Sequence, residues 1–594
     1  MDAREIQERA RQAEEDDRAW RTSAEEDFEF FLGHQWGSED QASLKSQKRP
    51  CLTINKLKPM VNLAIGWYIR NRYTVNVLPK ERGDEEVAKV LSYIIRHILH
   101  NTDASWKEVR AVSDGLICGR GYRMLTLDYS QDAYGDVGVG WADPLSIIYD
   151  PMAVEPNLSD AEFVMRYALM PLKRMQQVYG ASAEQVKAVQ KPSDTHAFNF
   201  IYRNQFDAKR YNQYMVLECW YKDYTRRWQI INQETGEPLA DVDSKQLAEA
   251  TASYYAMQGH RLAIKAFRPA RIKVKTICGD HVLASGDSPF SETDYPIVPY
   301  FASLVGGEHQ GLVTLGKDAQ REFNKRRSEL LHILITTGHS GWIREENSLV
   351  NENQFEDYAA TPGLDLVVKR SARRPDLPRQ IQPPMPPNDY VNASLMATQD
   401  IQATTGLNDD VLGIASNSEA SGRAIYLRRE QGLMSLADQM ENHRYSLIQL
   451  GRILVRTIQK HYTREKVFRI IGDDGKSIQT YAINQRLPAV DRLLNDVTLG
   501  KYDVAVSEQP DSPTQRMINF TMFTEYIRDM GKFASGPLGL PLLLAGLDLS
   551  PIQNKSEIKE LLMQYVQLLQ GFSPQQGQAG TAAPASGGAA QQPA

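Results

Sequence analysis

The stretch Leu315-Gly-Lys-Asp-Ala-Gln-Arg-Glu-Phe-Asn-Lys-Arg-Arg-Ser-Glu-Leu-Leu-His-Ile-Leu-Ile-Thr-Thr337 decides the architecture of this chain, because it predicts one long helix. About fifty residues rich in turns and prolines follow, and they end at Pro383-Pro384 and Pro386-Pro387. Asn388 then predicts the N-cap of a second helix that ends at residue 405. Two predicted helices therefore flank a compact, proline-bounded excursion.

Basic side chains follow one face of the first predicted helix. Lys317, Arg321 and Lys325 are spaced i, i+4 and i+8, and Arg326 and Arg327 add to their charge. Two acidic residues between them partly offset this charge. A solvated helix face is the simplest interpretation of such a run, and a face turned towards nucleic acid is the alternative.

A possible nucleotide site precedes the same helix. The segment Gly311-Leu-Val-Thr-Leu-Gly316-Lys317 matches the first seven positions of a phosphate-binding loop and follows a strand-like run. The eighth position must be Ser or Thr to bind magnesium, whereas this chain has Asp318, whose charge would repel phosphate. We therefore predict a helix start with an acidic first turn at this point.

No other catalytic or metal-binding pattern is present in the sequence. The eleven histidines form no ligand-spaced cluster, and Asp473-Asp474-Gly475 lacks the later ligands of a calcium loop and predicts a turn. The acidic pair Asp409-Asp410 has no partner that would assign it to acid/base chemistry. We expect a protein that is not an enzyme and that needs no cofactor or metal.

The residues before the long helix predict a mixed α and β region. Residues 1–33 have aromatic residues at helical spacing and predict one amphipathic helix that ends at Gly33. A helix leading into a strand that stops at Pro79, and a strand at Tyr122–Leu127, are predicted next. Residues 214–283 alternate aromatic and β-branched residues and predict a β-rich region with a helical insertion. The fold class is therefore α+β.

The residues after the second helix predict a loop, a long helix and smaller elements. A Ser/Asn/Gly-rich loop ends at Gly422, and a helical pattern follows in which Leu433, Met440, Leu447 and Leu454 repeat every seven residues. One face of this helix should be buried. A β-hairpin around residues 467–481 and two or three short helices up to Gly571 are expected next. Residues 573–594 contain no charged side chain and predict a disordered tail.

Composition excludes several classes of protein. The 594 residues exceed one ordinary core, and 68 basic against 74 acidic side chains give a formal net charge of -6, which argues against a chain that grips nucleic acid over its whole surface. Four distant cysteines suggest no disulfide framework. The sequence shows no secretory signal, and its most apolar stretch, Gly536–Leu549, is too short for a membrane span. We expect synthesis in the cytoplasm and no membrane partner.

Several motifs resemble a known family. Residues 317–328 resemble the first stem helix of portal proteins from short-tailed double-stranded DNA bacteriophages. Further motifs of that family occur in the same order across residues 20 to 510: Phe28–Trp36 (FEFFLGHQW), Arg49-Pro50, Thr53–Asn55, Gly119–Tyr122, Asp143–Leu145, Asp150-Pro151, Ser159–Ala161, Gly406–Gly413, Ser421–Tyr426 and Arg428-Arg429. Each motif alone is weak, but together they identify the chain as a member of the portal family.

The resemblance implies a portal fold that assembles into a ring of twelve copies around a central channel. Its parts would be a wing (1–314), a first stem helix (315–337), a clip (338–387), a second stem helix (388–405), a tunnel-facing loop (406–422), a long helix linking wing and crown (423–463), a hairpin with crown helices (464–572) and the tail (573–594). The chain ends soon after Phe572, so we expect no long C-terminal helical barrel.

The resemblance also implies a function. The ring would sit at one capsid vertex of the virion, after assembly in the host cytoplasm, and pass double-stranded DNA during packaging and ejection. Its expected partners are the terminase large subunit, which would hydrolyse ATP, head-to-tail adaptor proteins, and the major capsid and scaffolding proteins. The DNA-channel candidates are Lys317, Arg321, Lys325, Arg423 and Arg428, and the partner-binding candidates in the clip are Trp342, Phe355, Tyr358, Arg370 and Arg373.

A conduit must pass DNA without holding it, which bears on the expected channel. Neutralising even 6 to 10 phosphates makes an affinity change by roughly 10³ to 10⁵ over a modest salt range. We therefore expect a mostly acidic or neutral channel with sparse basic rings and no base recognition. Two alternatives stay open from the residues: an NTP-driven DNA motor built on residues 311–317, and a tail or scaffold structural protein without a DNA channel.

Overall fold

The computed structural model describes residues 1–80, 85–130, 132–180, 213–233, 238–257, 261–338, 342–343, 349–351, 353, 355, 367–369, 379–380, 388–406, 434–471, 478–487, 492–497, 500, 502–508, 520–521, 528 and 547. The chain divides into two units, residues 1–470 with 480–508, and residues 471–479 with 509–594. In the second unit only short strand ends and four helical residues are described. The first unit mixes helices and strands, as the sequence predicts.

The N-terminal region contains two helices where one was predicted. Helix α1 (Ala3–Asp16) and helix α2 (Arg18–Leu32) are separated at Asp17. The carboxylate of Asp17 binds Arg120 of a distant strand, so a tertiary ion pair accompanies the break. Helix α2 ends as predicted at Gly33, whose positive φ of 105° lets its N–H bond the carbonyls of Glu29 and Phe30.

The next elements include a three-stranded sheet on which α5 and α6 pack. Helix α3 (Ser38–Ser46), helix α4 (Leu57–Arg70) and strand β1 (Tyr73–Pro79) precede helices α5 (Glu85–Asn101) and α6 (Ala104–Cys118). The sheet has the order β12-β2-β3, with β2 at Arg120–Asp128, β3 at Asp136–Ala142 and β12 at Ile297–Phe301. Helix α6 packs on β2 at Gly121, where a Cβ would lie 1.9 Å from the Ala111 carbonyl oxygen. Only glycine fits there.

Two further sheets form the predicted β-rich region with its helical insertion. The five-stranded sheet has the order β11-β10-β6-β5-β4, and the three-stranded sheet has the order β8-β7-β9. Helix α9 (Lys245–Met257) packs on the smaller sheet, and helix α7 (Leu172–Tyr179) follows β5. The strands are β4 (Ile147–Tyr149, after the 3-10 turn η1, Pro144–Ser146), β5 (Phe163–Pro171), β6 (Gln213–Asp223), β7 (Arg227–Asn232), β8 (Pro238–Val242), β9 (Leu262–Phe267), β10 (Arg271–Cys278) and β11 (His281–Asp287).

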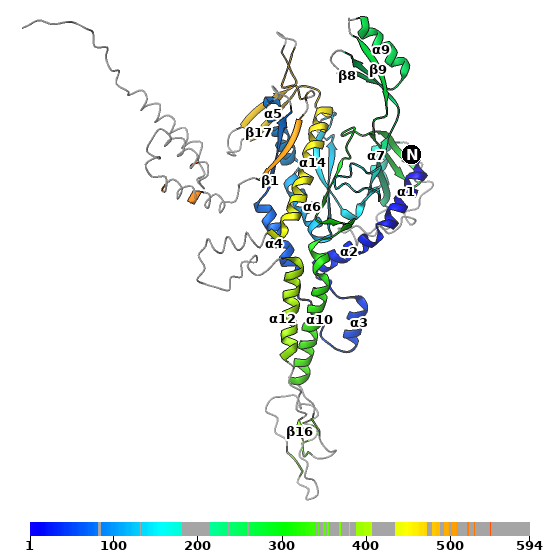
Figure 1. Cartoon of the computed structure of the whole chain (residues 1–594). Helices are drawn as coiled ribbons and strands as arrows, with labels where there is room; N and C mark the ends of the chain where they lie inside the picture. Colours follow the sequence, from blue (N-terminus) through cyan, green and yellow to red (C-terminus); the bar gives the residue numbers. More distant parts are fainter. Residues whose placement is uncertain are drawn as a thin grey trace, which may run out of the picture. The chain divides into compact units, whose positions relative to one another are not determined.

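The two helices around the excursion are present. Helix α10 spans Leu312–Gly338, three residues earlier than predicted at its start, and helix α12 spans Asn388–Thr405. They lie side by side (Figure 1), with Ala397 and Ile401 of α12 buried. Before α10, strands β13 (Leu304–Val305) and β14 (Glu308–His309) form a short hairpin. Inside the excursion, β15 (Trp342–Ile343) pairs with β16 (Arg379–Gln380), and Leu349 bridges Val368.

The long helix with the seven-residue repeat is α14 (Ala437–His461), preceded by the 3-10 turn η4 (Met434–Leu436). Its predicted buried face is confirmed, because Met440, Leu447, Leu450 and Leu454 are at most 4% exposed. This face packs on β12 and on the two-stranded sheet of β1 and β21 (Tyr502–Glu508). The remaining strands are β17 (Lys466–Ile471), β18 (Ile478–Ile483), β19 (Gln485–Leu487) and β20 (Arg492–Leu494).

Several predictions fall on residues outside the described part of the chain. These are the loop up to Gly422, the helical start over 423–433, the turn at 473–475, nearly all of the C-terminal helices and the tail. All four cysteines are free thiols; Cys118, Cys219 and Cys278 are buried, whereas Cys51 is partly exposed. Among the described residues, no helix has the length and apolar character needed to cross a membrane.

Candidate functional site

The segment that resembles a phosphate-binding loop is not a loop. Helix α10 begins at Leu312, so residues 312–317 are already helical, and the predicted acidic first turn is wrong because Asp318 lies in the second turn. Gly316 allows α10 to pack closely on Leu57, because a Cβ at this position would lie 2.5 Å from a methyl carbon of Leu57. A phosphate-binding loop wraps the backbone N–H groups of this segment around the phosphates, whereas here the Gly311 N–H donates to the Thr314 hydroxyl and the Leu315 N–H to the Gly311 carbonyl. The NTP-driven motor therefore loses its only sequence support.

Lys317, the first channel candidate, lies against α2. Its ammonium is 2.9 Å from a carboxylate oxygen of Glu26, 3.1 Å from one of Asp27 and 2.9 Å from the Ser23 hydroxyl, and its side chain is 13% exposed. Burial alone would lower the pKa of Lys317, but the hydrogen bond to Glu26 and the charge of Asp27 outweigh it, so the pKa is raised. The charge of Lys317 is therefore fixed and neutralised within the chain.

Asp27, the buried partner of Lys317, has a raised pKa. Its carboxyl group is 1% exposed, and burial raises its pKa to about 6, although Thr314 donates a hydrogen bond at 2.5 Å and Lys317 is adjacent. The neighbouring charge of Glu26 adds to the rise. One lysine thus serves two carboxylates, and Asp27 is the one that is easily protonated.

The next two channel candidates are also paired. Arg321 binds Glu26, lies 2.5 Å from Asp318, and its guanidinium stacks 4.8 Å from the ring centroid of Phe30. Lys325 is 60% exposed and lies 3.2 Å from Asp40 of α3.

The two arginines that follow differ from each other. Arg326 binds Glu322 one turn earlier, whereas Arg327 is exposed and has no ion pair within the described part of the chain. Acidic side chains from α2, α3 and α10 itself therefore neutralise most of the basic face.

A different face of α10 carries a row of buried polar side chains that the sequence reasoning did not single out. Gln320, Asn324 and Ser328 are spaced i, i+4 and i+8 and are at most 4% exposed. Their oxygens accept hydrogen bonds from the backbone N–H groups of Lys56, Ile54 and Leu52 at 2.9, 3.1 and 2.9 Å. Gln320 also donates to the Ile54 carbonyl at 2.8 Å. We call this set of contacts the α10 polar row.

The polar row joins three motifs that are far apart in the sequence. Asn324 donates to the Gln35 side chain at 2.6 Å, and Gln35 donates to the Phe30 carbonyl at 3.0 Å. Asn55 donates to the carbonyls of Phe30 and Phe31 at 3.2 and 3.1 Å. The residues 28–36, 53–55 and 317–328 are therefore neighbours in space and support one another.

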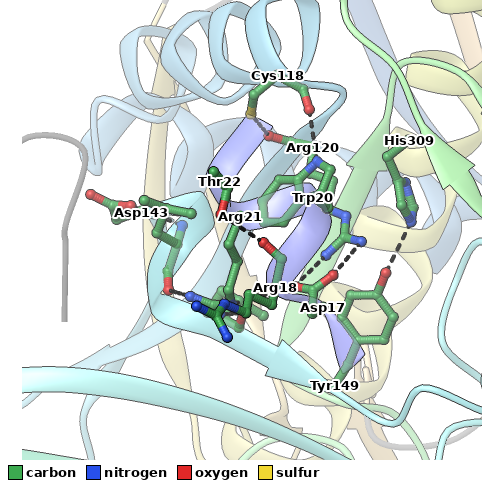
Figure 2. A network of polar contacts seen from close by, with 12 residues as sticks. Asp17, Arg18, Trp20, Arg21, Thr22, Cys118, Arg120, Asp143, Tyr149 and His309 are labelled. Carbon is green, nitrogen blue, oxygen red and sulfur yellow. Dashed lines mark hydrogen bonds and ion pairs between the residues drawn. The ribbon is translucent and has the colours of Figure 1, made fainter. Parts of the chain in front are cut away.

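A second polar network forms around Arg120 (Figure 2). Its guanidinium donates to both carboxylate oxygens of Asp17, at 3.0 and 2.8 Å, and stacks 3.8 Å from the ring of Trp20. Trp20 donates to the Cys118 carbonyl at 2.9 Å. The neighbouring Arg21 donates to the carbonyls of Leu145 and Ile147 at 2.8 and 3.0 Å. The motifs 119–122 and 143–145 thus meet at helix α2.

His309 lies beside this network. Its Nε2 is 3.0 Å from the hydroxyl of Tyr149, and its ring lies 4.4 Å from that of Phe301. Burial, together with the charge of Arg120, lowers the pKa of His309 to about 2. His309 is therefore neutral at physiological pH.

A family model described as Phage P22-like portal protein matches residues 7–594. The chain belongs to this portal protein family. A portal protein of Acyrthosiphon pisum secondary endosymbiont phage 1 is 24% identical over 537 residues, which is 85% of this chain and 72% of the relative. A portal protein of Helicobacter pylori bacteriophage KHP30 is 21% identical over 530 residues, which is 88% of this chain and 76% of the relative.

Family membership confirms the resemblance on which the sequence prediction rested. Portal proteins are structural components of phage virions with a role in the DNA-packaging channel, and this portal chain shares that general role. Within the described residues, no group of three or more His, Cys, Asp or Glu side chains could hold a metal ion.

The partner-binding candidates in the excursion are only partly described. Trp342 belongs to β15, opposite Gln380, and Phe355 is 7% exposed, so Phe355 packs inside the portal chain rather than on its surface. Tyr358, Arg370 and Arg373, and the channel candidates Arg423 and Arg428, lie outside the described residues. Their roles stay predictions.

Proposed function

We propose that this chain is one subunit of a ring of twelve portal proteins at one capsid vertex, through which double-stranded DNA enters and leaves the virion. In this proposal residues 1–314 form the wing, α10 and α12 the stem, residues 338–387 the clip and the residues after Arg464 the crown. Assembly takes place in the host cytoplasm, with the major capsid and scaffolding proteins as neighbours.

The observation that best supports a ring is the apolar surface of the α10–α12 pair. Four large apolar side chains on the pair are about half exposed or more: Leu334 (50%) and Ile335 (48%) on α10, and Leu395 (60%) and Met396 (64%) on α12. At 1.5 Å per residue, α10 is about 40 Å long and α12 about 27 Å, so the pair is an extended element. Apolar surface of this kind marks a contact with another protein, and the neighbouring subunit would cover it.

The ion pairs of α10 support a channel that grips DNA weakly. Lys317 and Arg321 already bind carboxylates of α2, so they add little net positive charge along α10. Lys325 is the most exposed of the three and binds only the exposed Asp40. We propose that Lys325 contacts passing phosphates without base recognition, and that Lys317 and Arg321 chiefly hold α10 against α2. Arg423 and Arg428 remain candidates for the same channel.

The excursion is the proposed docking site for partners. Trp342, Tyr358, Arg370 and Arg373 are its candidate contact residues, first for the terminase large subunit, which supplies ATP hydrolysis, and later for head-to-tail adaptor proteins. Deleting residues 341–378 should abolish terminase binding in a pull-down assay while the wing keeps its thermal unfolding transition. Terminase binding that survives the deletion would refute the docking site.

Electron microscopy of the purified full-length chain tests the central proposal. We expect closed rings with an open axial hole, and mass photometry should report about twelve copies. A chain that forms only monomers, or closed particles without an axial hole, would overturn the ring and favour a tail or scaffold protein without a channel.

A further inference from the structure

A cavity of about 720 Å³ lies beside the Arg120 network, between the end of α1, the loop after β4 and the β13–β14 hairpin. We call it the Arg120 cavity. Ile148, Tyr149 and Phe301 give it apolar and aromatic surface, and Arg120 and His309 are also among its lining residues. Figure 2 shows Tyr149, His309, Arg120 and Asp17 gathered at this place. Its volume is in the range of pockets that accommodate whole side chains or small ligands, roughly 300 to 1,000 Å³.

Exposed apolar side chains occur in the segments that line the cavity. Val154, which lines it, is 80% exposed. Met152 is 83% exposed and stands between two lining residues, and Val305 is 72% exposed and also stands between two lining residues. Single exposed apolar residues are ordinary, but three around one concave site indicate a surface that another protein covers.

The lining carries more negative than positive charge. The lining contains three acidic residues, Asp16, Asp17 and Glu155, and one permanent cation, Arg120. Arg120 is already paired with Asp17 through two hydrogen bonds. Neither Asp16 nor Glu155 has an ion pair among the described residues, and His309 is neutral. The cavity therefore suits an apolar or aromatic group that comes with lysine or arginine beside it.

The chain presents a group of this chemistry elsewhere on its surface. Trp106 is 66% exposed and, of the tryptophans whose exposure the structure describes, the only one above a third. Lys107 follows it and donates a hydrogen bond to the Val139 carbonyl at 3.0 Å, and the guanidinium of Arg110 lies 5.9 Å from the Trp106 ring and 3.7 Å from that of Trp141. Tryptophan and arginine are the residues that most often dominate binding energy at protein interfaces.

Trp106 is too far from the cavity of its own chain to enter it. It lies in the first turn of α6, whereas Cys118, at the last turn, adjoins Arg120 and Trp20. Twelve residues of α-helix separate the two ends by roughly 18 Å. Only a second copy can bring a Trp106 side chain to the Arg120 cavity.

We propose that Trp106 of one copy, with Lys107 and Arg110 beside it, inserts into the Arg120 cavity of the next copy. The two surfaces are different and lie on different parts of the subunit, so the contact is head-to-tail. Repetition of a head-to-tail contact closes into a ring when the rotation permits. This inference rests on the proposed ring and names one of the contacts that hold it together.

Cysteine crosslinking of the full-length chain tests the contact. Ser105→Cys and Val154→Cys are combined in a Cys51→Ser background, because Cys51 is the one cysteine that is not buried. Mild oxidation should give a covalent ladder that extends to the copy number of the ring, while each single cysteine variant gives none. The matched control replaces Ser105→Cys by Val178→Cys, at another exposed position, on α7, and should give no ladder.

The outcomes separate this contact from the proposed function. If electron microscopy shows rings but crosslinking gives no ladder, or gives an equal ladder in the control, the contact is refuted and the proposed ring is not. Absence of rings in the unmodified chain overturns the proposed function and this contact with it.

Surface variants give a second measurement. Trp106→Ala and Glu155→Lys should each raise the concentration needed for half-maximal ring assembly about tenfold or more. Tyr254→Ala, at a 61% exposed position on α9, should assemble normally. Unchanged assembly of Trp106→Ala with an unaltered melting temperature would refute the insertion.

Discussion

The side chain of Gln320 in α10 holds the backbone of Ile54, to whose carbonyl oxygen it donates a hydrogen bond of 2.8 Å. The same carboxamide accepts a hydrogen bond from the N–H of Lys56 at 2.9 Å. Gln320 therefore supplies residues 54–56 with the backbone hydrogen bonds that a neighbouring β-strand would otherwise provide. Alternate residues of an extended chain repeat every 6.5 to 7 Å or so, and residues four apart along a helix repeat about every 6 Å. This near match allows Asn324 and Ser328 to repeat the contact along the helix.

Loss of the Gln320 side chain should loosen residues 52–56. Gln320→Ala leaves the partly buried carbonyl of Ile54 and the N–H of Lys56 without these partners, which costs on the order of 1 kcal/mol for each group. Hydrogen exchange of the peptide that contains residues 52–56 should accelerate at least tenfold. Arg327→Ala, at an exposed position of the same helix, serves as the control and should leave that exchange unchanged. Equal exchange in the two variants would contradict the role of the polar row.

Asp27 should make the folded state less stable as pH rises from 4 to 7, because its buried carboxyl group must then ionise. Its folded pKa of about 6 exceeds its ordinary value of 3.8, so the protonated form favours the folded state. The stabilisation is complete below pH 4 and is lost as pH rises through 6, with a size on the order of 3 kcal/mol. The free energy of unfolding of Asp27→Asn, measured from pH 4 to 7, should lack this component. Parallel pH curves for the two proteins would show that Asp27 does not titrate in this way.

Arg120 should be more important for stability than its exposed neighbours. Arg120→Ala leaves Asp17 with only Arg21, at 3.5 Å, and removes the cation stacked on Trp20, so a loss of about 3 kcal/mol is expected. Arg120→Lys should recover only a small part, because lysine cannot form the two-bonded contact. Urea unfolding followed by tryptophan fluorescence measures both. Arg18→Ala, at an exposed position of α2, is the control, and a loss as large as that of Arg120→Ala would contradict the assignment.

Two helical glycines should respond to alanine with opposite signs. A Cβ on Gly66 in α4 meets no atom within 4 Å, so Gly66→Ala should stabilise the chain by about 0.5–1 kcal/mol. A Cβ on Gly115 in α6 would lie 2.4 Å from the buried ring of Tyr300, so Gly115→Ala should destabilise it by about 1–3 kcal/mol. Thermal unfolding of both variants checks the signs. A shift in the same direction for both would show that packing at Gly115 has been misjudged.

Substitutions on the basic face of α10 should have different effects at Lys317, which stabilises the fold, and at Lys325, which we propose contacts DNA. Lys317→Gln removes the partner of two carboxylates, one of them buried, and should lower the thermal stability of the subunit. Lys325→Gln removes a mostly exposed charge and should leave stability within about 0.5 kcal/mol, but change the rate of DNA packaging in an assay with terminase. Packaging that is unaffected by Lys325→Gln would remove Lys325 from the channel.

Local sequence pattern determined a large part of the fold of this chain. The helix pair around the proline-bounded excursion, the β-rich region and the buried seven-residue face of α14 follow from periodicity and from turn residues, which act over a few positions of the chain. The same patterns supported the family resemblance. They did not separate α1 from α2, because the partner of Asp17 is Arg120, more than a hundred residues away.

Only the tertiary structure decided what the charged and polar side chains of α10 do. From spacing alone, Lys317, Arg321 and Lys325 form one basic face, and nothing in their spacing reveals that Glu26, Asp27 and Asp40 lie against it. The row of Gln320, Asn324 and Ser328 has a visible helical spacing, but most of its partners are backbone atoms, which carry no sequence signal. The sequence by itself determined the helix and its family; the packing of distant segments on that helix decided which of its charges are neutralised and which polar groups are buried.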